Sequence, residues 1–160
     1  MFNRSYYEGL ISDPLEGLCR ENELPGRLQR LLAFEADLVE RRTRLLKCYL
    51  QISRAEQKLR LQQRLTHPHK RWKLGPGDLL AYRQYDLREQ RWSALLSASH
   101  SEQAPWYVIP AEHRWLRDWL LASLLARAFE QWHLQWPDRP APFSLAELEQ
   151  SYPPPVSGRR

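Results

Sequence analysis

The sequence predicts an α/β fold that is mostly helical and contains two to three short parallel strands. Two short apolar runs lie far apart in the chain, and a helical pattern follows each of them. Strands that alternate with helices form parallel sheets, because the chain must cross over between them. Two buried strands are not a stable sheet alone. We therefore expect further strands from a partner chain or from the rest of a larger domain.

The composition indicates a globular intracellular protein with a polyanionic partner. A chain of 160 residues with 42% hydrophobic content and seven tryptophans is long enough for one domain. The formal charge of +5 favours nucleic acid, nucleotides or phosphate polymers as partners. Cys19 and Cys48 form no disulfide framework, which fits the reducing cytoplasm. No apolar segment reaches the roughly 18 residues of a membrane span, so we expect no membrane partner.

The first 44 residues lead into an amphipathic helix. Met1–Leu10 begins abruptly with aromatic and polar residues, so we expect an upstream part to be missing. A third strand could come only from Met1 and Phe2. Residues 11–25 contain several turn formers and are expected to form a loop with at most one short helix. From Gly26 to about Arg44, apolar residues recur at helical spacing with arginines on the other side.

The central segment, Leu45–Leu65, is a buried strand that feeds a helix. Its apolar run extends to Ile52 and is broken only by Lys47 and Gln51.

Ser53 stands at the expected start of the helix that follows this strand. With Glu56 it forms a Ser-x-x-Glu capping box, in which each side chain accepts a hydrogen bond from the backbone of the other residue. Arg60 and Arg64 then lie one turn apart. A strand end, a helix N-terminus and stacked arginines predict an anion site. The alternative is an ordinary solvated helix face.

Residues 66–76 form a basic loop in which cations surround Trp72. Such a loop either stacks a base and grips phosphates, or the tryptophan anchors the loop to the protein body. Asp78 is expected to cap a helix from about Leu79 to Ser97. The histidines do not fall at metal-ligand spacing, and we assign no metal to them.

The last third of the chain holds the second strand and a long helix. Pro105–Pro110 is β-branched and aromatic and predicts a buried strand. Residues 111–113 form a turn, and Arg114–His133 is expected to be a core helix whose tryptophans pack inside. The tail, residues 136–160, is rich in proline and allows a short helix, Leu145–Gln150, capped by Ser144.

Several stretches, in order, resemble the polyphosphate kinase 2 family from Phe2 to about Arg117. They are FNRSYYE (2–8), AFEADLVE (33–40), TRLLKCYLQISRAEQKLR (43–60), the Trp72–Lys73 loop with Asp78–Leu79, and APWYVIPAEHRW (104–115). The resemblance implies that residues 1–135 are the C-terminal part of a P-loop-kinase-like three-layer domain. Residues from about 6 to 42 would be its mobile lid, and 136–160 a tail.

The resemblance also implies site residues and a cofactor. Asn3 and Arg4 stand at the Walker B-like strand end, where they would help to hold Mg²⁺ and contact phosphates. The phosphate chain would be bound by Arg60, with Lys58, Arg64 and Lys73 as weaker candidates. The loop near the nucleotide base would contain Glu112, His113 and Arg114.

One departure from the family pattern bears on activity. None of the six glycines belongs to a Walker A loop ending in Gly-Lys, so we expect little or no kinase activity from this chain alone. In the intact domain the reaction would be phosphoryl transfer between inorganic polyphosphate and a nucleoside mono- or diphosphate. The chain would act in a homo-oligomer or with a P-loop-containing chain, with nucleic acid a less favoured partner.

Two alternatives remain. One is a non-catalytic basic module that binds polyphosphate or nucleic acid, or that regulates an intact paralogue. The other is a broken or misassigned gene without a selected function.

Overall fold

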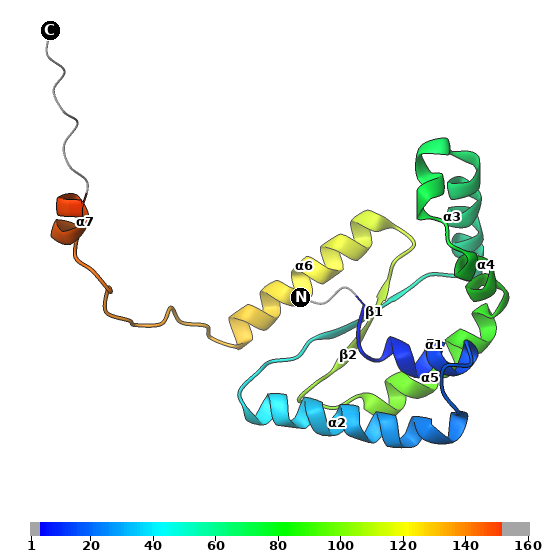
Figure 1. Cartoon of the computed structure of the whole chain (residues 1–160), viewed down its shortest axis with the longest axis horizontal. Helices are drawn as coiled ribbons and strands as arrows, with labels where there is room; N and C mark the ends of the chain where they lie inside the picture. Colours follow the sequence, from blue (N-terminus) through cyan, green and yellow to red (C-terminus); the bar gives the residue numbers. More distant parts are fainter. Residues whose placement is uncertain (1–3, 152–160) are drawn as a thin grey trace, which may run out of the picture. The chain divides into compact units, whose positions relative to one another are not determined.

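The computed structural model describes residues 4–151, which form mostly helices (Figure 1). The elements are α1 (Glu8–Leu15), η1 (Glu21–Glu23), α2 (Leu24–Glu40), β1 (Lys47–Gln51), α3 (Arg54–Thr66), η2 (Pro68–Lys73), α4 (Pro76–Arg83), α5 (Tyr85–Ser99), β2 (Trp106–Pro110), α6 (Arg114–Gln131) and α7 (Leu145–Ser151). The chain divides into two compact units, Met1–Ser123 and Leu124–Arg160.

The sheet of the first unit is parallel, as the sequence predicts. β1 pairs with β2 so that Lys47 lies opposite Trp106 and Gln51 opposite Pro110. The third strand expected at Met1 and Phe2 lies outside the described residues. Leu50 and Val108 keep 47% and 52% of their surface exposed, so two strands and the described helices cover the sheet incompletely.

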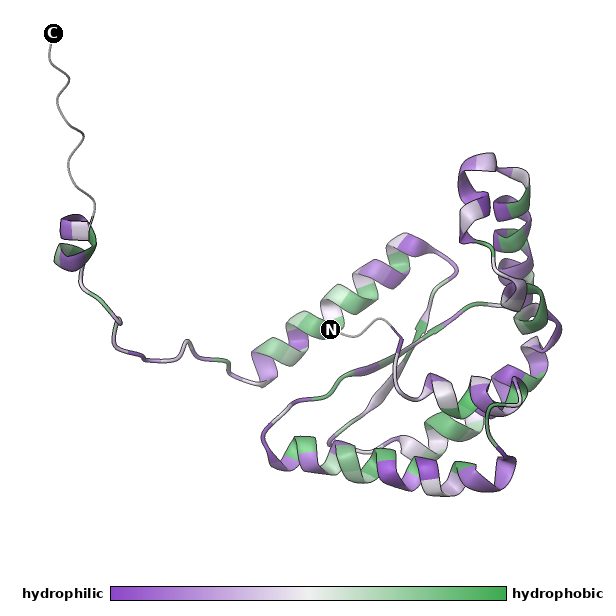
Figure 2. Ribbon diagram, in the orientation of Figure 1, coloured by the Kyte–Doolittle hydropathy of each residue, from purple (hydrophilic) through white to green (hydrophobic). Residues whose placement is uncertain are grey.

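One hydrophobic core joins the N-terminal helices to the sheet. Tyr7, Leu10 and Ile11 are buried against Leu95 of α5, and Trp106 of β2 packs on them. Figure 1 shows α1, α2 and α5 grouped beside the strands, and Figure 2 shows hydrophobic and hydrophilic residues alternating along α2. The expectation for residues 11–25 allowed one short helix, and α1 extends into this segment as far as Leu15, because burial of its apolar residues favours a helix there.

This core also bears on the expected lid. Tyr7 is fully buried, and Leu10 and Ile11 belong to the same cluster, so the start of the segment from 6 to 42 is part of the fold's centre. The lid motion itself stays a prediction.

A charged pair lies in the interior at the amino end of β1. The Lys47 ammonium group lies 2.7 Å from Glu35 Oε2, and only 8% and 5% of the two side chains are exposed. Lys47 also donates to the Ser99 carbonyl at 2.8 Å and to the Tyr7 hydroxyl at 3.2 Å, while the Tyr6 hydroxyl donates to Glu35 Oε1 at 2.7 Å. The lysine that interrupts the apolar run is thus a fully paired buried charge.

The helix expected from 79 to 97 is divided in two at Gln84. α4 begins three residues earlier than predicted, with Gly75 at its N-cap position. Asp78 does not act as the N-cap residue: it lies in the first turn and accepts the Gly75 backbone N–H at 2.8 Å. Both predictions about this segment are therefore wrong in detail, although its helical character is confirmed.

α6 is a helix, as predicted, but it is not a core helix. In the first unit Trp115 and Trp119 are 71% and 61% exposed, and in the second unit Phe129 is 47% exposed. These large apolar side chains stay exposed, so the prediction that the helix is buried in the core is wrong. In the second unit the expected short helix is present as α7, where Ser144 Oγ accepts from the Glu147 backbone N–H at 3.2 Å.

Candidate functional site: a pocket at the carboxyl ends of the strands

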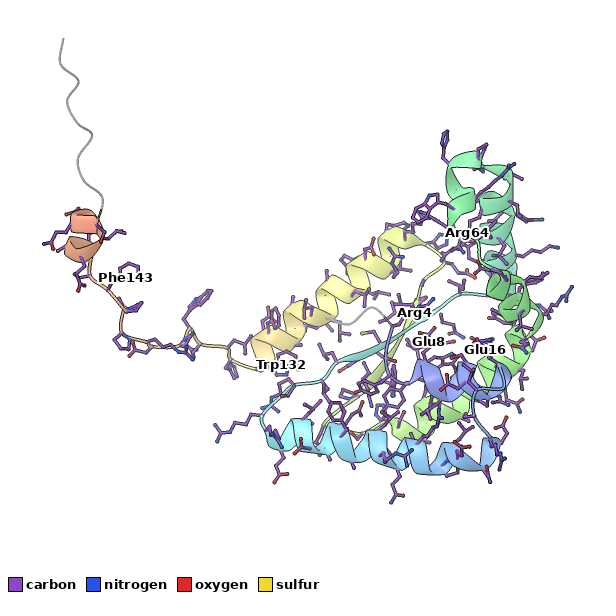
Figure 3. All side chains as sticks on the ribbon, viewed as in Figure 1. Arg4, Glu8, Glu16, Arg64, Trp132 and Phe143 are labelled. Carbon is purple, nitrogen blue, oxygen red and sulfur yellow. The ribbon has the colours of Figure 1, made fainter. Side chains whose placement is uncertain are left out.

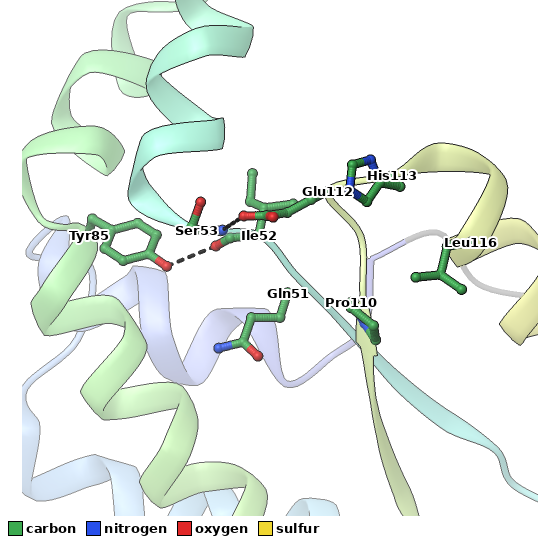
Figure 4. Close-up of a pocket in the computed structure, with 8 residues that line it drawn as sticks. All are labelled: Gln51, Ile52, Ser53, Tyr85, Pro110, Glu112, His113 and Leu116. Atoms are coloured by element: carbon green, nitrogen blue, oxygen red, sulfur yellow. Dashed lines mark hydrogen bonds between the residues drawn. The ribbon is translucent and has the colours of Figure 1, made fainter.

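A pocket of about 360 Å³ lies where β1 and β2 end (Figure 4). Its lining residues are Gln51, Ile52, Ser53, Tyr85, Pro110, Glu112, His113 and Leu116. In open parallel sheets, ligands bind outside the carboxyl ends of the strands, because the following loops and helix N-termini converge there. The lining combines apolar and polar side chains, as small-molecule sites do.

The N-terminus of α3 forms one wall of this pocket. Ser53 Oγ accepts the Glu56 backbone N–H at 3.2 Å, which confirms Ser53 as the N-cap residue. The second half of the predicted capping box is wrong. The Ser53 backbone N–H donates to Glu112 Oε1 at 3.2 Å, while the Glu56 carboxylate accepts Arg60 Nε at 2.7 Å.

Glu112 therefore brings its own negative charge to the helix N-terminus. Hydrogen bonds from Ser53 are the main cause that lowers the pKa of the Glu112 carboxyl, and the charges of His113 and Arg60 add to them. The carboxylate takes the position that an anionic ligand would occupy at the start of a helix. A phosphate group is consequently repelled from this corner of the pocket.

Arg60 joins α3 to the turn after β2. Its Nη2 donates to the Ala111 carbonyl at 2.7 Å and to the Glu112 carbonyl at 3.1 Å, while its Nε is paired with Glu56. The Arg60 guanidinium group thus holds the backbone at Ala111 and Glu112 in place. Its predicted role in phosphate binding stays a prediction.

Tyr85 and Gln51 complete the wall toward α5. The Tyr85 hydroxyl donates to the Ile52 carbonyl at 2.8 Å, and Gln51 Nε2 donates to Glu89 Oε2 at 3.1 Å. Burial, with the nearby carboxylates Glu89 and Asp86, raises the pKa of Tyr85, so its hydroxyl remains a donor at neutral pH. Sequence reasoning did not single out either residue. For Gln51, its position at the end of a predicted strand was an available signal. Tyr85 lies 33 residues from the Ile52 carbonyl that it binds, and no local pattern indicates that contact.

The remaining predicted cations lie on α3 and beside it. Lys58 and Lys73 are exposed, and Arg64 Nη1 lies 3.7 Å from Asp78 Oδ1. Trp72 is 79% exposed, which contradicts a role as a buried anchor, and the Lys73 ammonium lies 5.2 Å from its ring centroid. The basic aromatic segment folds as the helix η2 and presents its tryptophan to solvent.

Two of the predicted site residues, Asn3 and Arg4, lie near the N-terminus. Asn3 lies outside the described residues. Arg4 has a positive φ of 68°, and its 81% exposed side chain lies 3.7 Å from Glu8, beside which Figure 3 shows it. Glu112 and His113 line the pocket together, but Arg114, the first residue of α6, does not.

The residues described here do not assemble a metal centre. Over residues 4–151 no group of three or more His, Cys, Asp or Glu side chains has the arrangement of a metal site. The Mg²⁺ that the resemblance implies would be held at Asn3, which is not among these residues. Within the same residues no helix is both long and apolar enough to cross a membrane.

A parallel sheet with a pocket at the carboxyl ends of its strands is the arrangement in which open α/β domains bind their ligands. The sequence model of the family Polyphosphate kinase 2 (PPK2) matches residues 1–135. The chain belongs to the polyphosphate kinase 2 family.

Individual relatives agree with this assignment. The AMP/ADP-polyphosphate phosphotransferase of Meiothermus ruber is 38% identical over 137 residues, which are 86% of this chain and 51% of that protein. An uncharacterized protein of Leptolyngbya boryana is 29% identical, and the match covers 69% of this chain and 82% of that protein. The crystal structure of polyphosphate kinase 2 from Arthrobacter aurescens superposes with a TM-score of 0.80 at 34% identity, covering 94% of this chain and 52% of the other. The chain spans about half the length of the phosphotransferase and of the solved kinase.

Proposed function

We propose that this chain is the part of a polyphosphate:nucleotide phosphotransferase that carries the base-side pocket and the phosphate-chain cations. The observation that carries the proposal is the pocket at the strand ends, lined by Glu112 and His113 and bordered by the basic helix α3. The relative from Meiothermus ruber is named an AMP/ADP-polyphosphate phosphotransferase. The proposed reaction moves a terminal phosphoryl group between inorganic polyphosphate and a nucleoside mono- or diphosphate.

The charge distribution suggests how a nucleotide would lie. Phosphates avoid the Glu112 carboxylate and are attracted to exposed cations such as Lys58 and Lys73. The base would occupy the pocket, where Ile52, Pro110 and Leu116 offer apolar contacts. The pocket's polar groups would orient the base, and the cations of α3 and η2 would hold the phosphate chain.

Turnover in this proposal needs residues from elsewhere. Phosphoryl transfer depends on positioning and on stabilising charge, and the sequence has no Gly-Lys cradle for the transferred phosphate. We therefore infer that a P-loop-containing half completes the site. Asn3, Arg4 and Mg²⁺ would act only in that complete arrangement, which we place in the cytoplasm.

The test is to mix this chain with a P-loop-containing half and to measure nucleotide phosphorylation from polyphosphate. Turnover in the mixture and none in either part supports the proposal. Arg4→Ala should then abolish turnover in the mixture. Failure of every mixture to turn over, with nucleotide and polyphosphate present, counts against a catalytic role.

A second candidate is a non-catalytic basic module that binds polyphosphate, or that regulates an intact paralogue by association. It is favoured by the Leptolyngbya boryana relative, of which this chain covers 82%, so a relative of comparable extent exists. In this case polyphosphate binding with a steep salt dependence would occur without turnover in any mixture. Self-association as a homo-oligomer is the corresponding alternative to a heterologous partner.

A further inference from the structure

The helix η2 presents a tryptophan to solvent among cations. Trp72 is 79% exposed. The three cations beside it, Lys70, Arg71 and Lys73, are exposed as well, and residues 66–77 contain no carboxylate. The segment therefore offers an aromatic ring and a concentration of positive charge in one place.

Neighbouring carboxylates do not neutralise this charge in the part of the chain that the structure describes. Within residues 4–151 no ion pair involves Lys70, Arg71 or Lys73, whereas the arginines of the neighbouring helix α3 each have a carboxylate partner. Arg71 Nε donates to the Leu65 carbonyl at 3.1 Å, which holds η2 against the end of α3. The segment is thus fixed in place while its charge remains available to an anion.

The tryptophan distinguishes between the polyanions that suit this charge. Inorganic polyphosphate has no ring, so it could bind the cations but would leave the indole in water. Single-stranded nucleic acid offers phosphates to the cations and unpaired base faces to the indole, and one stacked base strengthens binding by roughly tenfold to a hundredfold. The Lys73 ammonium lies 5.2 Å from the ring centroid and can cover only one face of the ring. The other face is suited to a base.

The exposure of Trp72 also decides between the two roles that the sequence allows for this segment. A tryptophan that anchors the loop would be buried, and Trp72 is not. No residue of η2 lines the pocket at the strand ends, and η2 follows the far end of α3, about 20 Å along that helix from Ser53. A mononucleotide in that pocket and a base on Trp72 would therefore occupy different places.

We propose that η2 binds single-stranded nucleic acid, with one base stacked on Trp72 and phosphates held by Lys70, Arg71 and Lys73. Nucleic acid is the less favoured partner on sequence grounds, but an exposed ring among unpaired cations favours it at this segment. The binding goes beyond the proposed phosphotransfer, because it uses neither the pocket nor a P-loop. Polyphosphate competes for the cations, and only the nucleic acid uses the ring.

The test measures the binding of a labelled oligothymidylate of about 12 nucleotides to the full-length chain at low salt. The comparison ligands are an abasic strand of the same length and inorganic polyphosphate. We expect the wild type to bind the oligothymidylate roughly tenfold more tightly than the abasic strand. Trp72→Ala should remove this difference and leave the affinity for polyphosphate unchanged, whereas Trp72→Phe should retain most of the difference.

Trp136→Ala is the matched control. Trp136 is 96% exposed, but the charges that follow it, Asp138 and Arg139, are of opposite sign. This variant should bind every ligand as the wild type does. The double variant Lys70→Ala/Arg71→Ala should make the salt dependence of oligothymidylate binding shallower by roughly one to one and a half units, because two phosphate contacts are lost.

Four results would overturn the proposal. The first is no binding of the oligothymidylate by the wild type, and the second is equal affinity for the oligothymidylate and the abasic strand, neither of which depends on the folding of a variant. The third is an equal loss of oligothymidylate and polyphosphate binding in Trp72→Ala, since the ring would then act through the fold. The fourth is displacement of the oligothymidylate by excess ADP at constant ionic strength, which would place the base in the substrate pocket. Binding of ADP itself tests the proposed function separately.

Discussion

The two ends of the two-stranded sheet use charge in opposite ways. At the amino end, Lys47 and Glu35 are buried as a pair, and Tyr7 and Ser99 complete the hydrogen bonds of the ammonium group. At the carboxyl end, Glu112 is exposed beside the pocket. The buried pair is closed to any ligand and stabilises the fold. The exposed end keeps its polar groups reachable, which is what a binding site requires.

The largest expected effect is at the buried end. Lys47→Met should lower the free energy of unfolding by about 3–5 kcal/mol, because it leaves the Glu35 carboxylate buried without its partner. Urea denaturation of the purified chain measures this loss. The double variant Lys47→Met/Glu35→Leu should recover much of the stability, since no charge then remains buried. If Lys47→Met were as stable as the wild type, the claim that Lys47 and Glu35 form a buried ion pair would be contradicted.

Alkaline pH should destabilise the fold through its buried tyrosines. Burial and the nearby Glu35 raise the pKa of Tyr6 and of Tyr7, and burial with Glu89 raises that of Tyr49. These hydroxyls stay protonated in the folded state, whereas in the unfolded chain they ionise near pH 10. The unfolding free energy should therefore show no tyrosine-dependent change below about pH 10 and fall above it. Tyr49→Phe should reduce this fall in the unfolding free energy. If the variant lost as much stability above about pH 10 as the wild type, the raised pKa of Tyr49 would be contradicted.

Loss of the helix cap at the open end should have an intermediate effect. Ser53→Ala should cost about 1 kcal/mol of stability, because the Glu56 backbone N–H loses its acceptor. Ser144→Ala is the matched control, since it removes an equivalent cap from α7 in the second compact unit. Its effect on the unfolding of the first unit should be absent. Equal losses in both variants would show that the loss of stability is not specific to the cap of the first unit.

The smallest effect is expected from Glu112→Gln. Removing this carboxylate should increase polyphosphate affinity roughly twofold to fivefold at low salt, because one repulsive charge near the cations of α3 is lost. The gain should vanish at high salt through screening. Glu102→Gln, an exposed carboxylate outside the pocket, serves as the control in the same titration. A fall in affinity would mean that Glu112 itself supports the bound ligand.

Local patterns in the sequence predicted a large part of the fold. The apolar runs predicted both strands, and their alternation with helices predicted the parallel pairing. Ser53 and Ser144 each marked a helix start, because an N-cap acts on a backbone N–H three residues away. The strand and helix predictions depend on contacts between near neighbours in the chain, which periodicity and capping rules describe well.

The features that sequence reasoning missed depend on distant contacts. The Ser53 backbone N–H is bound by a carboxylate 59 residues further on, and Arg60 binds carbonyls 51 and 52 residues away. No local rule contains these partners. The exposure of Trp115 and Trp119 on α6 was missed for a related reason, since an apolar helix face predicts burial without saying which element covers it.

The most direct test of the open end as a polyanion site is the salt dependence of polyphosphate binding. The affinity of the chain is measured from low to high salt, for the wild type and for the double variant Lys58→Ala/Lys73→Ala. We expect the logarithm of the wild-type affinity to fall linearly with the logarithm of salt concentration, and the slope to be shallower by roughly one to two units in the variant. Absence of binding at low salt, or the same slope in both proteins, would contradict the account.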